Sequence, residues 1–228
     1  MASPAQAGAA AVASAPELDF AVEDGYALRH TMAPTLGLAV RVASGDGRPV
    51  RSLALNVQLR IAATRRAYAP AEQERLVEVF GAPEAWGRNL GSLLWATSTV
   101  NVPPFAGETV FELAVPCTYD FEVASAKYLH ALEGGEVPLE LLLSGTVFYA
   151  GSGGGLQVAS LPWDREAQHR LPVSVWRETM AQHFGDSAWL RLRRDSFDRL
   201  YAYRTRHAML SWEDVLADVL DRAEREEA

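Results

Sequence analysis

A long apolar run beside a glycine-rich loop is the feature that most restricts how this chain can fold. Residues 137–149 are rich in Leu, Val and aromatic residues, and the loop at 151–155 follows almost directly. After the loop, residues 156–161 alternate apolar and polar side chains. Two such segments around a short glycine-rich connection are typical of a β-hairpin. We therefore expect a hairpin within residues 136–163, with more sheet before it and helices after it.

The region before the hairpin repeats the period-two pattern of strands. Residues 53–61 are the clearest case, because aliphatic residues occupy alternate positions and Asn56, Gln58 and Arg60 lie between them. Further candidate strands lie at 18–22, 36–42, 93–102, 109–115 and 118–123. The pair Asp24-Gly25 is expected to form the turn after the first strand. Many strands at even spacing predict an antiparallel β-sandwich or a strongly bent sheet.

Helical patterns occur in one insertion and throughout the last part of the chain. A short helix is expected near 70–81, with Glu72, Glu74 and Glu78 on its solvated side, and a helical turn at 124–132. After residue 163, the pattern predicts a cap of about three helices.

The starts of these three helices have separate signals. Pro172 lies in the first turn of one, and Asp195 is expected to cap the next. Ser211 and Asp214 resemble a capping box for the third, with Leu210 placed to pack on Val215. The fold class is therefore mainly β with a helical cap, α+β. The expected parts are a disordered tail at 1–17, a sandwich at 18–162, and a cap at 163–224 that packs on the sheet.

Composition excludes several classes of function. The formal net charge is −8, and nucleic-acid binding normally needs a basic face. No window approaches about 18 uncharged apolar residues, and the N-terminus has no basic segment of a signal peptide. Cys117 is the single cysteine, so no internal disulfide can form. We expect a cytoplasmic protein.

No motif predicts a catalytic centre. No lysine follows a glycine-rich stretch as a phosphate-binding loop requires, and no helix opens after the glycines of 151–155 as a dinucleotide fingerprint requires. The five histidines lack metal-ligand spacing. We therefore expect no catalytic residue, no cofactor and no metal. One alternative stays open, an enzyme whose site combines distant residues such as Ser152, His130 and Cys117.

The last third of the chain has the composition of a protein-binding surface. Trp and Tyr dominate binding hot spots, and arginines favour an acidic partner. We expect a partner protein to bind here, and we exclude nucleic acid and a membrane span. The candidate partner-binding residues are Trp176, Trp189, Arg191, Arg193, Arg194 and Tyr203.

Several segments together resemble a known family. They are KYLHAL at 127–132, VPL at 137–139, SGTVFY at 144–149, Pro162-Trp163, Pro172-Val173, Val175-Trp176, and Phe197-Asp198 with Leu200. They are similar to an uncharacterised, actinobacterial-type family with a domain of unknown function, encoded beside genes for high-affinity nickel–iron hydrogenases. The resemblance implies a genomic neighbourhood and supplies no catalytic residues. Residues 195–200 also resemble, over this short segment alone, the SecB-type export chaperones.

Three functions follow as hypotheses. The first is a non-catalytic accessory or scaffolding protein, in the context of hydrogenase assembly or maturation if the resemblance holds. The second is a chaperone-like protein that binds unfolded segments on exposed hydrophobic side chains of the sheet. The third is the enzyme with a site assembled from distant residues.

Overall fold

The computed structural model describes residues 15–118, 120, 123–151, 154–185, 187 and 190–227. The chain forms two compact units, residues 1–188 and residues 189–228. We call them the sandwich unit and the helical unit, and each is described by itself.

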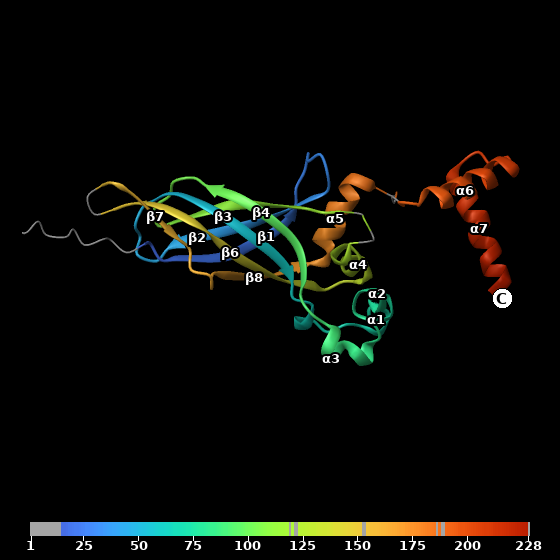
Figure 1. The fold of residues 1–228 in the computed structure, drawn as a ribbon, viewed down its shortest axis with the longest axis horizontal. Helices are drawn as coiled ribbons and strands as arrows, with labels where there is room; N and C mark the ends of the chain where they lie inside the picture. The colour runs from blue at the N-terminus through green and yellow to red at the C-terminus, as the bar shows by residue number, and fades with distance from the viewer. Residues whose placement is uncertain are drawn as a thin grey trace, which may run out of the picture. The chain divides into compact units, whose positions relative to one another are not determined.

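The sandwich unit contains two antiparallel sheets, which confirms the predicted fold class (Figure 1). The first sheet has the order β1-β2-β5, with β1 at Leu18–Ala27, β2 at Thr35–Ser44 and β5 at Glu108–Pro116. The second has the order β4-β3-β6-β7, and β8 also pairs with β6. Its strands are β3 (Val50–Ile61), β4 (Leu93–Val102), β6 (Glu136–Ala150), β7 (Leu156–Ser160) and β8 (Glu166–Pro172).

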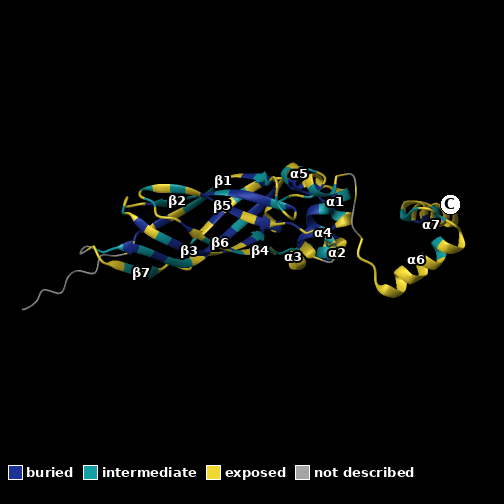
Figure 2. Ribbon diagram, turned by 90° about the horizontal axis from the view of Figure 1, so that it is seen from above, coloured by how far each residue is buried: buried dark blue, intermediate teal, exposed yellow. Residues whose placement is uncertain are grey.

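The two sheets share one hydrophobic core. On β3 the alternate residues from Leu53 to Ile61 are at most 1% exposed, while Asn56 and Gln58 are exposed, as the pattern predicted. The same core cluster contains Leu38 of the first sheet and Leu141 of the second (Figure 2). At the margins, β1 lies beside β8 and β4 lies beside β5. The strands therefore enclose their apolar faces between two layers.

Short helices close one end of the sandwich unit. The expected helix near 70–81 is present as α1 (Pro70–Arg75) and α2 (Val77–Phe80), and Gly81 ends it with a φ of 75°. The 3-10 turns η1 (Ala63–Arg65) and η2 (Pro83–Ala85) flank this pair, and α3 (Trp86–Asn89) follows. The helix α4 (Ala124–Ala131) occupies the expected helical turn.

One expectation about α1 is wrong. Glu72 is 3% exposed and does not lie on a solvated face. Its carboxylate forms a 2.6 Å ion pair with Arg66 and accepts hydrogen bonds from the backbone N–H groups of Ala69 and Glu133. Buried carboxylates persist in proteins when they are paired in this way. Glu72 therefore joins the inserted helices to the segment that leads into β6.

The strand predictions also need three corrections. Asp24 and Gly25 lie inside β1 and pair with Ala39 and Leu38 of β2, just after a register shift at Glu23, so they do not form a turn. Strand β8 was not expected, because only Ala167 and Leu171 of its residues are buried. Within 118–123, Thr118 and Asp120 belong to no strand, and the other positions before α4 lie largely outside the described residues.

Three helices occur in the last part of the chain, at the expected positions. The first, α5 (Val173–Phe184), belongs to the sandwich unit and contacts β1 and β2. The helical unit contains α6 (Arg194–Arg206) and α7 (Trp212–Glu227). The docking of these two helices on the sheet stays a prediction.

Candidate partner-binding surface

The helical unit has almost no core of its own. Among residues 190–226, whose exposure the structure describes, Val215 alone is buried (Figure 2). Three apolar residues of α7 form a stripe beside it, Leu216 and Val219 at 37% exposure and Leu220 at 60%. Their spacing puts them on one side of the helix. We call these three residues the apolar stripe.

Local hydrogen bonds determine where α7 begins. The backbone N–H of Ser211 donates to the Asp214 carboxylate at 3.1 Å, and the N–H of Asp214 donates to the Ser211 hydroxyl at 3.0 Å. This is the predicted capping box. The predicted packing of Leu210 on Val215 is absent, because Leu210 is 89% exposed. On α6, Asp195 lies in the first turn and Arg193 is at the N-cap position, so the predicted Asp195 cap is wrong.

Side chains of both helices join α6 to α7. The Tyr203 hydroxyl donates a hydrogen bond to Asp218, and Arg222 forms an ion pair with the same carboxylate at 3.1 Å. The hydrogen bond from Tyr203 is the main reason that the pKa of Asp218 lies below its ordinary value. The guanidinium of Arg222 also lies 5.5 Å from the centre of the Tyr203 ring. These contacts hold the two helices together where little apolar area is buried.

Three aromatic rings form a cluster on the helical unit, and two of them, Phe197 and Tyr201, are exposed. Phe197 and Tyr201 stack with ring centres 6.3 Å apart, and Trp212 lies 5.4 Å from Phe197. Phe197 is 39% exposed and Tyr201 is 55% exposed. Arg204 lies over the Trp212 ring at 5.0 Å and donates to the backbone carbonyls of Met209 and Leu210. We call Phe197, Tyr201 and Trp212 the aromatic face.

Exposed arginines precede this face in the chain. Arg191 and Arg193 are exposed, and Arg194 forms an ion pair with Asp198 at 3.2 Å. The side chains of Arg194 and Asp198 are 84% and 56% exposed, so the pair is solvated and its contribution to stability is small. The positive charge of these residues is therefore accessible to a partner.

A groove runs along another side of α6. It has a volume of about 520 Å³ and contains Leu200, Val219 and the ring of Tyr203. Arg199 and Arg206, both exposed, also line it. The groove thus combines an apolar lining with positive charge.

The structure does not bring the predicted binding residues into one surface. Tyr203 lines the groove, and Arg191, Arg193 and Arg194 lie at the start of the helical unit. Trp176 belongs to the sandwich unit and is 3% exposed, with its ring centre 4.7 Å from that of His130. Trp189 lies outside the described residues. The aromatic face was not among the predicted binding residues, because the spacing of Phe197 and Tyr201 is equally typical of a helix core.

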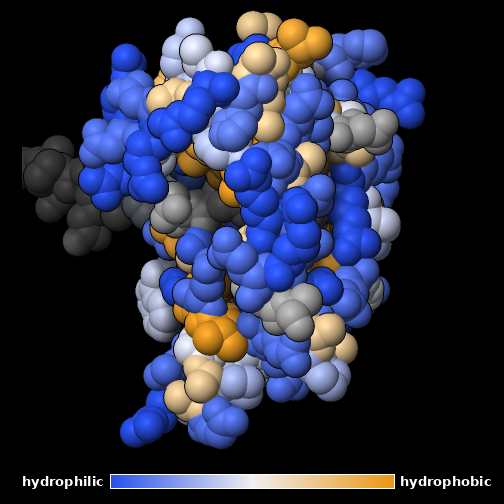
Figure 3. Space-filling view, turned by 90° about the vertical axis from the view of Figure 1, so that its right-hand side faces the viewer, coloured by the Kyte–Doolittle hydropathy of each residue, from blue (hydrophilic) through white to orange (hydrophobic). Residues whose placement is uncertain are grey.

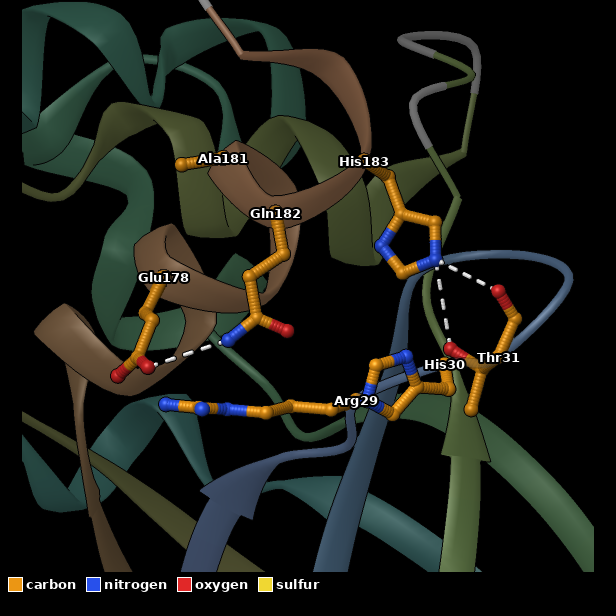
Figure 4. A pocket seen from close by; sticks show the side chains of 7 residues that line it. All are labelled: Arg29, His30, Thr31, Glu178, Ala181, Gln182 and His183. Carbon is orange, nitrogen blue, oxygen red and sulfur yellow. Dashed lines mark hydrogen bonds between the residues drawn. The ribbon is translucent and has the colours of Figure 1, made fainter.

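The sandwich unit has its own open hollow, between the β1–β2 loop and α5 (Figure 4). Its volume is about 790 Å³, and it is lined by Arg29, His30, Thr31, Glu178, Ala181, Gln182 and His183. His183 Nε2 lies 3.1 Å from the backbone carbonyl oxygen of Thr31, which can only accept a hydrogen bond. Gln182 donates to Glu178 at 3.1 Å. The contact of His183 attaches α5 to the loop, whereas the hydrogen bond of Gln182 lies within α5.

Two residues of the enzyme hypothesis lie in the described part of the chain. Cys117 is buried, and burial raises the pKa of its thiol to about 12. Burial, followed by the charge of Arg177, lowers the pKa of His130. Ser152 lies outside the described residues. In that same part of the chain, no group of three or more His, Cys, Asp or Glu side chains could hold a metal ion.

Other exposed hydrophobic side chains are scattered over the surface. Figure 3 shows one face, on which hydrophobic residues form small patches between hydrophilic ones. On the sandwich unit the most exposed are Met32 and Trp163, at 104% and 94%. None of the helices that the structure describes is both long and apolar enough to cross a membrane.

Comparison with protein families identifies the chain. The model of a family of unknown function, DUF6084, matches residues 15–228. The chain belongs to this family. No curated protein matches it.

Solved structures give only distant similarities. The CARDB domain of the PF1109 protein from Pyrococcus furiosus, in complex with di-metal ions, has 13% identity and a TM-score of 0.27 over 68% of this chain and 91% of that chain. β-Glucosidase 3B from Thermotoga neapolitana, in complex with α-D-glucose, has 12% identity and a TM-score of 0.25 over 68% of this chain and 17% of that chain. The Kluyveromyces marxianus β-glucosidase in complex with glucose has 12% identity and a TM-score of 0.24 over 68% of this chain and 15% of that chain. Similarities of this size establish neither a shared fold nor a shared activity.

Proposed function

We propose that this DUF6084 protein is a non-catalytic accessory or scaffolding protein of the cytoplasm. It binds a partner protein through the aromatic face of the helical unit. The observation that carries the proposal is the exposure of Phe197 and Tyr201 on a unit with a single described buried residue. Exposed aromatic rings that bury area at little entropic cost are typical binding anchors.

The charge near the aromatic face indicates the kind of partner. Arg191 and Arg193 are exposed, and they lie on a chain whose overall charge is −8. A partner that combines apolar side chains with acidic ones complements this surface. The resemblance of the sequence to a family encoded beside nickel–iron hydrogenase genes makes hydrogenase subunits and maturation factors the first partners to test.

The experiment uses the tagged full-length chain in its own host, with quantitative mass spectrometry of retained hydrogenase components. We expect Phe197→Ala combined with Tyr201→Ala to reduce their retention by more than about tenfold, because truncating a hot-spot residue costs about 2 kcal/mol or more and about 1.4 kcal/mol corresponds to a factor of ten. Arg193→Glu should weaken retention, mainly at low salt.

The matched control is Trp163→Ala, which removes an aromatic ring that is 94% exposed on the sandwich unit. We expect it to retain the same components as the wild type. Equal retention by the wild type and the Phe197, Tyr201 variant would contradict the proposal.

A second candidate is a chaperone-like binder of unfolded segments. It is supported by exposed hydrophobic residues on the sandwich strands, namely Leu94 (57%), Val110 (51%), Leu156 (66%) and Val158 (58%). Exposed apolar surface of this kind can bind unfolded chains. If this function is correct, we expect the wild type to suppress the aggregation of an unfolded client protein. The double variant Leu156→Asp with Val158→Asp should lose this activity.

A further inference from the structure

We propose that the helical unit pairs with the helical unit of a second copy of this chain, so that the protein is a homodimer. In this dimer the α7 helix of each copy packs into the groove and against the apolar stripe of the other. The inference goes beyond the proposed function, because it uses the groove and the stripe and leaves Phe197 and Tyr201 free.

The first argument is the lack of a core. A hairpin of two short helices that buries only Val215 among its described side chains cannot offset the entropy of its own folding. Leu216, Val219 and Leu220 remain exposed on one side of α7. Pairing with another helix pair is the ordinary way to bury such a stripe, and it produces a four-helix bundle.

The second argument is the continuity of the apolar surface. Val219 belongs to the stripe and also lines the groove, so the two features meet at this residue. Leu200 and the ring of Tyr203 extend the apolar lining onto α6. A helix of a second copy therefore finds apolar contacts on both α6 and α7.

The third argument is charge. The segment 190–206 has six arginines and two aspartates, whereas α7 has seven acidic residues and two arginines. Arg199 and Arg206 line the groove. Glu213 and Glu224 lie beside the stripe on α7, given about 3.6 residues per turn. An acidic α7 thus complements the basic groove of another copy, and a two-fold axis makes both contacts at once.

Phe197 and Tyr201 of the aromatic face lie apart from the groove, whereas Trp212 is four residues before Leu216 and so shares the stripe's side of α7. Phe197 and Tyr201 are four residues apart, so they share one side of α6. Arg199, Tyr203 and Arg206 share roughly the opposite side at about 3.6 residues per turn. The dimer therefore leaves Phe197 and Tyr201 of each copy available to a partner.

The first test measures the oligomeric state of the full-length chain by sedimentation equilibrium. We expect a dimer for the wild type and a dissociation constant raised by more than about 100-fold in Leu216→Asp with Leu220→Asp, because two charges would be buried. Circular dichroism confirms that the variant is folded. The control Leu156→Asp with Val158→Asp places the same charges on exposed positions of the sandwich unit and should leave the dimer unchanged.

The second test exchanges charges. Arg199→Glu with Arg206→Glu makes the groove acidic, and Glu213→Arg with Glu224→Arg makes the stripe's flank basic. We expect each variant alone to dimerise more weakly than the wild type by about tenfold or more, and an equimolar mixture to recover a heterodimer.

Three results would overturn the dimer. They are a wild type that stays monomeric, a dimer that survives the stripe variant, and an equimolar mixture that dimerises as weakly as its components. A monomer that still retains hydrogenase components would contradict this inference alone. A dimer whose retention is unaffected by the Phe197 and Tyr201 substitutions would contradict only the proposed function.

Discussion

The Tyr203 hydroxyl on α6 donates a hydrogen bond to the Asp218 carboxylate on α7, and this pair joins the two helices of the helical unit. The bond lowers the pKa of Asp218 below its ordinary value of 3.8 and raises the pKa of Tyr203 above 10.0. A depressed carboxyl pKa contributes stability that is present above the unfolded pKa and is lost as pH falls through the folded value. A raised tyrosine pKa contributes stability that is present below the unfolded pKa and is lost as pH rises through the folded value. The pair is therefore most effective between these two limits.

Tyr203→Phe should raise the pKa of Asp218 toward its ordinary value, because the main cause of the depression is removed. The measurement is an NMR titration of the aspartate carboxyl carbons. Tyr201→Phe is the control, since it removes a hydroxyl from the opposite side of α6 and should leave Asp218 unchanged. An unchanged Asp218 pKa in Tyr203→Phe would show that the hydrogen bond is absent in solution.

Glu72→Ala should destabilise the sandwich unit by about 3 kcal/mol or more, because it leaves the Arg66 charge buried without its partner. The two side chains are 4% and 11% exposed. Urea unfolding followed by circular dichroism measures the change. Glu74→Ala, at an exposed position of the same helix, should change the free energy of unfolding by less than about 0.5 kcal/mol. Equal effects of the two substitutions would contradict the buried position of Glu72.

Gly145→Ala should destabilise the protein by more than about 2 kcal/mol, since it introduces both a clash and backbone strain. Gly145 pairs with Leu55 of β3 at a φ of 153°, and an added Cβ would lie 2.0 Å from the carbonyl oxygen of Ala54. Thermal unfolding measures the loss. The matched substitution Gly134→Ala places its Cβ in open space and should have little effect. A stable Gly145→Ala variant would mean that β3 and β6 can move apart there.

Cys117 should react with iodoacetamide at pH 8 more than about 100-fold slower in the folded protein than in urea, because the thiolate is the reactive form. Burial raises the pKa of this thiol to about 12. A raised pKa contributes stability that is present below the unfolded value near 9 and is lost as pH rises toward 12. Cys117→Ala should therefore lose less stability than the wild type between these pH values. Rapid alkylation of the folded protein would contradict the burial of Cys117.

Patterns within a few residues predicted much of the fold. The alternation from Leu53 to Ile61 defined β3 and its buried face, because period-two burial is a local property of a strand. Ser211 and Asp214 predicted the start of α7 for the same reason, since both hydrogen bonds of the capping box lie within one turn.

Features that depend on distant neighbours were missed. Strand β8 has few apolar residues, and it is a strand because the long β6 offers a free edge over Glu136–Leu142. Glu72 has the sequence context of an exposed helix residue, yet Arg66 and the backbone of Glu133 surround it. No local pattern contains such contacts.

For the candidate surface too, some features follow from the sequence and others only from the tertiary structure. From the sequence alone, the last helices are amphipathic and rich in aromatic residues and arginines, because these are properties of the residues themselves. Only the tertiary structure decided that Trp176 is covered while Phe197 and Tyr201 are exposed. Hydrophobic periodicity shows that one side of a helix is apolar, but the packing of other elements against that side determines whether water or protein covers it.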